Sequence, residues 1–318
     1  MPSPEKMRTP SLSGTILLFS ETLDWHAKQL AGAVRKRGIR LKRLAFREVH
    51  LDTTKPTGFA IPGFEDALPA GVFVRGIPAG SFEQVTMRLG LLHALRDLGV
   101  PVWNDARAIE ACIDKSMTSH LLAKAGIPTP ATFAVQTRMA AAEIVTRELA
   151  RGGDLVLKPL FGAQGRDLKL IRSPEDLPQE AEVMGAYYLQ RFVPTGEFAQ
   201  DFRVFVSGGR AIAAMMRTAR EGEWITNVKQ GGIPQRCLLT PRLRELAEQA
   251  AAVTGADYAG VDLIRDREGN ILVLEVNSMP AWSGLQSVMP EADIAEILIE
   301  DFTRALEKDI PERLLTRT

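Results

Sequence analysis

The stretch of residues 258–279, YAGVDLIRDREGNILVLEVNSM, constrains the fold of this chain more than any other segment. Two apolar runs flank the polar segment DREGN, a pattern that predicts a β-hairpin reversing inside that segment. Side chains two apart on a strand share a face, so Glu275 and Asn277 point the same way. Pairing Asp262 with Glu275 places the reversal within DREGN and gathers all three polar side chains.

These three side chains predict a metal site. Apolar neighbours would leave the carboxylates of Asp262 and Glu275 partly buried, and a buried carboxylate pair needs a cation. Ligation by oxygen alone favours magnesium or manganese, which commonly accompany nucleotide phosphates. The alternative is a pair of ordinary strands with acidic side chains in solvent. Against it, Glu275 sits in the apolar run 271–276, which is typical of a central strand.

Composition leaves room for an enzyme and excludes two classes of partner. The chain has 318 residues and is 45% apolar, enough for two or three domains. Its 39 basic and 39 acidic residues balance, so no overall field attracts nucleic acid or an anionic membrane. Without a membrane-spanning run or a signal peptide, we expect a cytoplasmic protein. Cys112 and Cys237 lack metal-ligand spacing and are expected to be reduced packing residues.

The first part of the chain predicts a small α/β domain. Residues 1–13, rich in proline and serine, are expected to form a flexible tail. Buried strands at 15–20, 72–76 and 100–103 alternate with helices at about 23–37 and 82–98. Ser81 with Gln84 has the spacing of a capping box for the second helix. Arg75 follows a strand end, where such sheets bind ligands, although a structural salt bridge accounts for it equally well.

A second unit begins near residue 104. One helix is predicted from about 107 to 125 and another from 139 to 151, followed by strands at 155–159 and 168–172. The loop between the strands, LFGAQGRD, could cover a triphosphate because glycine lets backbone N–H groups approach phosphates. It lacks the GK[ST] of a P-loop, and glycine hairpins are common. Lys158, in an otherwise apolar strand, is either exposed or paired with a phosphate.

The motifs in their order resemble those of the ATP-grasp ligases, most closely the RimK-like branch. They are Asp114-Lys115, Lys158-Pro159, GAQG at 162–165, YLQRFV at 188–193, DFRVFV at 201–206, GVDL at 260–263 and LEVNSMP at 274–280. The resemblance implies an ATP-grasp fold of α/β and α+β parts. Its domains would be an N-terminal α/β domain at 14–104, a central lobe at 105–187 and a C-terminal lobe at 188–318, with the two lobes clamping ATP.

The resemblance also implies a chemistry and a set of site residues. Such ligases use ATP to convert a carboxylate into an acyl phosphate, which an amine then attacks. The implied nucleotide contacts are Lys115, Lys158, Gly162 and Gly165 for the phosphates, Gln190, Arg191, Phe192 and Val193 for adenine, and Glu197 for the ribose. Asp262, Glu275 and Asn277 would hold two magnesium or manganese ions.

Three further residues are assigned to the reacting centre by resemblance. Arg203 and Arg217 match arginines that face the acyl phosphate, and each could instead serve only as an ion-pair partner. Asn227 matches an asparagine near the transferring phosphate, in a loop completed by Gly231 and Gly232.

Departures from RimK concern the acceptor. RimK has glycine in place of Asp167 and arginines in place of Ile225 and Gln230, so we expect a different acceptor. The runs at 74–86 and 277–286 resemble the branch that adds glutamate to tetrahydromethanopterin-type coenzymes. Within the second run, Trp282 would either stack on a flat ring or pack in the core.

The expected function is therefore ATP-dependent ligation of L-glutamate to a small coenzyme carboxylate. A protein or peptide C-terminus is the alternative acceptor. A non-catalytic ATP sensor is the alternative of another class, and it would lack lysine or metal positions that are present here. The amphipathic helix predicted at 294–306 serves either core packing or the seam of a homo-oligomer.

Overall fold

The computed structural model describes residues 14–162 and 165–315, with side chains as far as Glu307. The expected flexible tail, residues 1–13, lies outside the described residues. The chain forms two compact units. Unit 1 comprises the residues up to Ala106 together with those from Asp293 onward, and unit 2 comprises Arg107–Ala292. The division near residue 104 expected from the sequence lies close to this boundary, whereas the division at residue 187 between two lobes stays a prediction.

Unit 1 is built on a parallel sheet in the order β2-β1-β5-β6. Its strands are β1 (Thr15–Phe19), β2 (Arg40–Leu44), β5 (Gly71–Val74) and β6 (Val102–Trp103). Three of the four follow the predicted apolar runs. The sequence analysis missed β2, RLKRL, because this edge strand alternates apolar with basic residues. A two-stranded antiparallel ribbon, β3 (His50–Leu51) and β4 (Phe59–Ala60), completes the strands described in this unit.

The helices of unit 1 begin where their capping residues stand. In α1 (Trp25–Lys36) the N-cap Asp24 accepts a hydrogen bond from the Ala27 N–H at 2.8 Å. In α2 (Phe82–Asp97) the side chain of Ser81 accepts from the Gln84 N–H, and the Gln84 side chain accepts from the Ser81 N–H. The predicted capping box is confirmed. The short helix η1 (Phe46–Glu48) follows β2.

The C-terminal helix α8 (Ile294–Leu315) belongs to unit 1, whereas the sequence analysis grouped it with the C-terminal lobe. Phe302 packs edge-to-face on Phe73 of β5, with ring centroids 5.5 Å apart. Gly71 makes room for the helix, since a Cβ there would lie 2.5 Å from a methyl carbon of Leu306. The apolar residues of this helix therefore serve the core, but periodicity alone could not say which sheet would cover them. A homo-oligomer stays a prediction.

Unit 2 contains two antiparallel sheets. The first has the order β7-β10-β8-β9, and α5 (Arg138–Ala150) packs against it. Its strands are β7 (Thr132–Val135), β8 (Leu155–Lys158), β9 (Lys169–Ile171) and β10 (Tyr187–Arg191). Short helices η2 (Pro174–Asp176) and η3 (Glu180–Val183) connect β9 to β10. The predicted strand-loop-strand arrangement around residues 160–167 is confirmed for β8 and β9.

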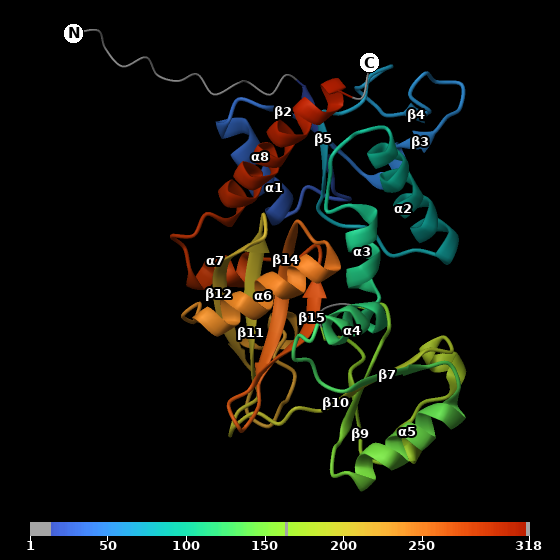
Figure 1. Cartoon of the computed structure of the whole chain (residues 1–318), viewed down its shortest axis with the longest axis vertical. Helices are drawn as coiled ribbons and strands as arrows, with labels where there is room; N and C mark the ends of the chain where they lie inside the picture. The colour runs from blue at the N-terminus through green and yellow to red at the C-terminus, as the bar shows by residue number, and fades with distance from the viewer. Residues whose placement is uncertain (1–13, 163–164, 316–318) are drawn as a thin grey trace, which may run out of the picture. The chain divides into compact units, whose positions relative to one another are not determined.

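The second sheet has the order β13-β12-β11-β14-β15, and α6 (Pro241–Thr254) lies across one face of it (Figure 1). Its strands are β11 (Gln200–Ser207), β12 (Arg210–Thr218), β13 (Ile233–Arg236), β14 (Tyr258–Arg265) and β15 (Ile271–Asn277). Apolar side chains of α6 and of the strands form a hydrophobic core. The short helices η4 (Val228–Gln230) and α7 (Ser283–Val288) also lie in this unit.

The single helix expected at 107–125 is wrong. The structure has two helices, α3 (Ala106–Ile113) and α4 (Lys115–Lys124), separated at Asp114. The Asp114 carboxylate accepts hydrogen bonds from the N–H groups of Ser116 at 2.8 Å and Met117 at 3.2 Å, which makes it the N-cap of α4. Lys115 is consequently the first residue of a helix and not a mid-helix lysine. Across the described part of the chain, no helix combines the length and apolar character needed to cross a membrane.

Candidate active site

The hairpin of β14 and β15 has the predicted register. Asp262 lies opposite Glu275, and Asn277 lies opposite Gly260. The register shifts after Asp262, where Leu274 is the additional residue of a bulge. Asn277 Nδ2 donates to Glu275 Oε1 at 3.1 Å. The period of two along each strand therefore brings the three expected metal ligands together.

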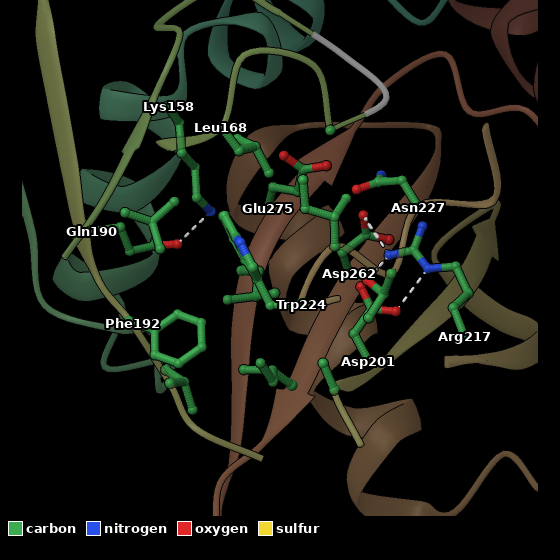
Figure 2. Close-up of a pocket in the computed structure, with 18 of the residues that line it drawn as sticks. Lys158, Leu168, Gln190, Phe192, Asp201, Arg217, Trp224, Asn227, Asp262 and Glu275 are labelled. Atoms are coloured by element: carbon green, nitrogen blue, oxygen red, sulfur yellow. Dashed lines mark hydrogen bonds and ion pairs between the residues drawn. The ribbon is translucent and has the colours of Figure 1, made fainter. Parts of the chain in front are cut away.

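A pocket in unit 2 is lined from both of its sheets (Figure 2). Most of the predicted site residues line it: Lys115, Lys158, Gly162, Gly165, Gln190, Arg191, Phe192, Val193, Arg217, Asn227, Asp262 and Glu275. Three others do not line it. Arg203 bonds Asp262, Asn277 bonds Glu275, and Glu197 is exposed in the segment between β10 and β11.

One side of the pocket is lined by Asp201, Arg217 and Asp262, which are buried. With the half-buried Arg203, which bonds Asp262 but does not line the pocket, they form a network that we call the arginine wall. Arg217 donates through Nε to Asp201 Oδ1 at 2.7 Å, and its Nη2 contacts both Asp201 Oδ2 and, at 3.1 Å, Asp262 Oδ2. Arg203 donates two hydrogen bonds to the Asp262 carboxylate, from Nε to Oδ1 at 2.7 Å and from Nη2 to Oδ2 at 2.6 Å. Both arginines are thus ion-paired, as their alternative interpretation expected, while Arg217 also lines the pocket.

The pKa values within the arginine wall reflect this pairing. Burial alone would raise the pKa of Asp262, but the charges of Arg203 and Arg217 hold it well below its usual range. Burial alone would lower the pKa of Arg217, but the carboxylates of Asp201 and Asp262 raise it further above neutrality. Asp262 and Arg217 therefore stay charged around neutral pH.

The opposite side, which we call the lysine wall, consists of Lys115, Lys158 and their hydrogen-bond acceptors. Lys158 Nζ donates to Gln190 Oε1 at 2.6 Å. Lys115 Nζ donates to the carbonyl oxygen of Gly162 at 2.8 Å and contacts that of Leu160 at 3.4 Å. Burial lowers the pKa of both lysines, and the nearby Glu275 carboxylate partly opposes this. Every acceptor of these hydrogen bonds is neutral.

Two glycines, Gly165 and Gly232, allow close approach of the backbone to the segment of Thr226 and Asn227. Gly165 has φ +68°, and a Cβ there would lie 2.3 Å from Asn227 Oδ1, so only glycine fits without displacing that side chain. Gly232 is equally restricted, because a Cβ would lie 1.8 Å from the Thr226 carbonyl oxygen. Asp167 has φ +57°, a left-handed conformation. The position at which RimK has glycine thus keeps a backbone conformation that favours glycine.

The apolar end of the pocket is formed around Trp224 and Phe192, which pack edge-to-face with ring centroids 5.9 Å apart. Next to them, the backbone N–H of Arg191 donates to Ala131 O and that of Phe192 to Asp154 O, each at 2.8 Å. The Arg191 side chain pairs with the buried carboxylate of Glu148.

The sequence analysis missed Asp201 and Trp224 and left Trp282 open. Asp201 could have been found, since it stands two residues before Arg203 on a strand and so shares its face. Trp224 lies between strands, where no periodicity marks it. Trp282 is fully buried and packs edge-to-face on Phe205 at 6.1 Å, so the alternative of stacking on a substrate ring is wrong.

The oxygen donors of the hairpin fit a hard divalent ion. Asn277 uses its amide nitrogen toward Glu275 and Gly260 O, which leaves its amide oxygen as the atom able to ligate. Asp262 is shared with two arginines, so any ion held by it also sits beside their charges. Among the described residues no group of three or more His, Cys, Asp or Glu side chains is placed to hold a metal ion.

Comparisons with known proteins show which proteins this chain is similar to. The model of the RimK-like ATP-grasp domain matches residues 112–302. A tetrahydromethanopterin:alpha-L-glutamate ligase of Methanosarcina acetivorans is 33% identical over 309 residues, covering 85% of this chain and 92% of that protein. A probable alpha-L-glutamate ligase of Legionella pneumophila is 33% identical, covering 66% and 73%. The ATP-grasp ligase PsnB, solved with a variant precursor, Mg and ADP, superposes with a TM-score of 0.72 at 21% identity, covering 93% and 98%.

Proposed function

The chain belongs to the RimK-like ATP-grasp family and is an ATP-dependent ligase with the ATP-grasp fold, and from this we infer that it joins the amino group of L-glutamate to a carboxylate acceptor. The observation that carries the proposal is the pocket in which two lysines with neutral partners face the carboxylates of the hairpin. Family membership and the presence of every lysine and metal position argue against the ATP-sensor alternative.

The lysine wall is the proposed site of the nucleotide phosphates. Lys115 and Lys158 would contact them, and the loop bearing Gly162 and Gly165 would cover them. The backbone of residues 190–193 would bind adenine beside Trp224. The N–H groups of Arg191 and Phe192 are already engaged, so the N–H of Val193 is the donor best placed for a base nitrogen. Glu197 stays a prediction as the ribose contact, and it lies outside the pocket lining.

Asp262, Glu275 and Asn277 would hold two Mg²⁺ or Mn²⁺ ions. Charge supports this assignment. The two walls carry four cationic side chains, and Asp201, Asp262 and Glu275 offset three of them, so a bound triphosphate would leave the pocket strongly negative. Divalent cations bound there would offset that negative charge.

In the proposed reaction an acceptor carboxylate oxygen attacks the terminal phosphorus of ATP, and the bond from that phosphorus to the bridging oxygen of ADP breaks. The amine of L-glutamate then attacks the acyl carbon of the resulting acyl phosphate, loses a proton and expels inorganic phosphate. Arg217 and Asn227 line the pocket where donors to the developing negative charge are needed. Arg203 would act by holding Asp262 in place.

A small coenzyme carboxylate of the tetrahydromethanopterin type is the first proposed acceptor, because the Methanosarcina relative matches over most of both chains. A protein or peptide C-terminus is the second candidate. It gains weight from the burial of Trp282, which removes a side chain that could have recognised a flat ring.

The test is ADP release by the purified protein with ATP, Mg²⁺ and L-glutamate, with and without a panel of pterin-coenzyme and peptide carboxylates. D-glutamate is the matched control. We expect acceptor-dependent ADP release and a product heavier by one glutamyl residue. If the rate of ADP release were the same with and without L-glutamate for every acceptor of the panel, the proposed reaction would be refuted.

A further inference from the structure

The side chain of Gln190 has every polar atom engaged. It is 1% exposed on β10. Its Oε1 accepts the hydrogen bond from Lys158 Nζ at 2.6 Å, which Figure 2 draws as a dashed line. Its Nε2 donates to Thr132 Oγ1 at 3.2 Å and to Tyr188 Oη at 3.3 Å. These bonds fix the orientation of the amide, with its oxygen toward the lysine.

The same chain of hydrogen bonds continues to the helix that carries the other lysine. Tyr188 Oη lies 2.8 Å from Ser119 Oγ, and both residues are buried. Burial raises the pKa of Tyr188 to about 12, so the hydroxyl keeps its proton at neutral pH. Ser119 belongs to α4, which begins at Lys115. One buried network of neutral groups therefore connects the elements that carry both lysines.

We propose that Gln190 is a positioning residue that aims the Lys158 ammonium at the nucleotide phosphates without neutralising it. This rests on the proposed function and goes beyond the backbone role assigned to the 190–193 segment. An ammonium has three donors. One is held by Gln190, which leaves two for phosphate oxygens. A carboxylate at the same place would neutralise Lys158 and repel the phosphates.

The experiment measures the dissociation constants of ATP, ADP and adenosine by calorimetry for the wild type, Gln190→Glu and Gln190→Met. Loss of a charge-assisted contact costs about 1.5–3 kcal/mol, so Q190E should bind ATP and ADP about 10- to 100-fold more weakly. Adenosine, which lacks phosphates, should bind all three proteins alike. In Q190M the lysine keeps its charge but loses the hydrogen bond that orients it. The ATP affinity of Q190M should therefore lie between those of the wild type and Q190E.

Gln200→Glu is the matched control, since it adds the same charge to the same pocket from a residue that bonds Thr218 and not Lys158. Its loss of ATP affinity should be clearly smaller than that of Q190E. Equal losses of ATP affinity in Q190E and Q200E would show that the effect is general charge repulsion, which would overturn the proposal. Adenosine affinity lost in step with ATP affinity would show a structural role in the adenine site, which also overturns it. If the wild type bound no ATP, the proposed function would fail instead.

Discussion

The two walls each contain two buried or half-buried cationic side chains, but the hydrogen-bond acceptors of these cations differ. The arginine wall pairs its guanidinium groups with the carboxylates of Asp201 and Asp262. The lysine wall offers its ammonium groups only an amide oxygen and backbone carbonyls as hydrogen-bond acceptors. Figure 2 shows Lys158 with Gln190 on one side of Glu275 and Arg217 with Asp201 on the other.

This difference indicates that the arginine wall mainly stabilises the fold and that the lysine wall mainly binds ligand. A buried guanidinium held by two carboxylates is part of the fold, because removing it strands charges without a partner. An ammonium bonded only to neutral oxygens keeps its positive charge, which the nearby Glu275 carboxylate offsets only in part, and it can bind an anion. Mutations in the arginine wall should therefore lower the stability of the protein, whereas mutations in the lysine wall should lower its affinity for nucleotides.

The largest expected effect is in the arginine wall. Arg217→Ala should lower the free energy of unfolding by about 3–5 kcal/mol, because Asp201 loses its cation and Asp262 one of two. Turnover should fall by about 10²- to 10³-fold if Arg217 also stabilises developing charge. Urea unfolding and ADP release measure the two effects. Adding Asp201→Asn should recover part of the stability, and an unchanged unfolding curve for R217A would contradict the distinction between the walls.

Lys158→Met should behave in the opposite way. ATP affinity should fall by about 10- to 100-fold through loss of a charged contact. Stability should hold or rise, because a buried ammonium no longer has to be desolvated. Calorimetry and urea unfolding provide the comparison. Lys169→Met, on the neighbouring strand of the same sheet and exposed, is the control and should change neither quantity much. A loss of stability as large as that of R217A would contradict the prediction.

The pH dependence of binding should reveal the lysine wall as well. Burial lowers the pKa of Lys115 and of Lys158, so both lose their charge at a lower pH than an exposed lysine, near 10.4. Only the protonated form attracts phosphate, so ATP affinity should fall as the pH rises toward about 10, by at most about tenfold per pH unit for each lysine. Adenosine affinity, measured over the same range, should stay flat. A decline confined to the usual lysine range would argue against burial as the cause.

The smallest effect concerns the loop that contributes an acceptor to Lys115. Asp167→Gly should raise the free energy of unfolding by less than about 1 kcal/mol, because glycine relieves the left-handed conformation at φ +57° but is more flexible when unfolded. The same change at Asp66, exposed and outside that conformation, should instead lower stability. Thermal or urea unfolding distinguishes the two, and a loss at Asp167 would show that its side chain has a role of its own.

Local rules predicted what depends on neighbours in sequence. The register of Asp262 with Glu275 followed from the period of two, and the start of α2 followed from the Ser81–Gln84 spacing. The break before α4 could have been predicted in the same way, since Asp114 is a strong N-cap residue directly before Lys115.

The partners of individual side chains were beyond such rules. Gln190 was assigned to the site for its backbone, yet its side chain holds Lys158, 32 residues away. Arg191 was assigned with it, and its side chain pairs with Glu148 in α5. Each partner lies on another element, and many polar residues of the chain could have filled the same role.

The sequence by itself determined many of the helices and strands, the register of the hairpin and the family, because each is encoded in spacing along a short segment or in the order of motifs. Only the tertiary structure decided that α8 joins the N-terminal sheet, that Trp282 is buried, and that the arginines bond carboxylates while the lysines bond neutral oxygens. Those outcomes depend on which residues far apart in the sequence come into contact. Contacts of charged groups matter most where they are buried, because a buried charge is costly unless a protein group or a ligand pairs with it.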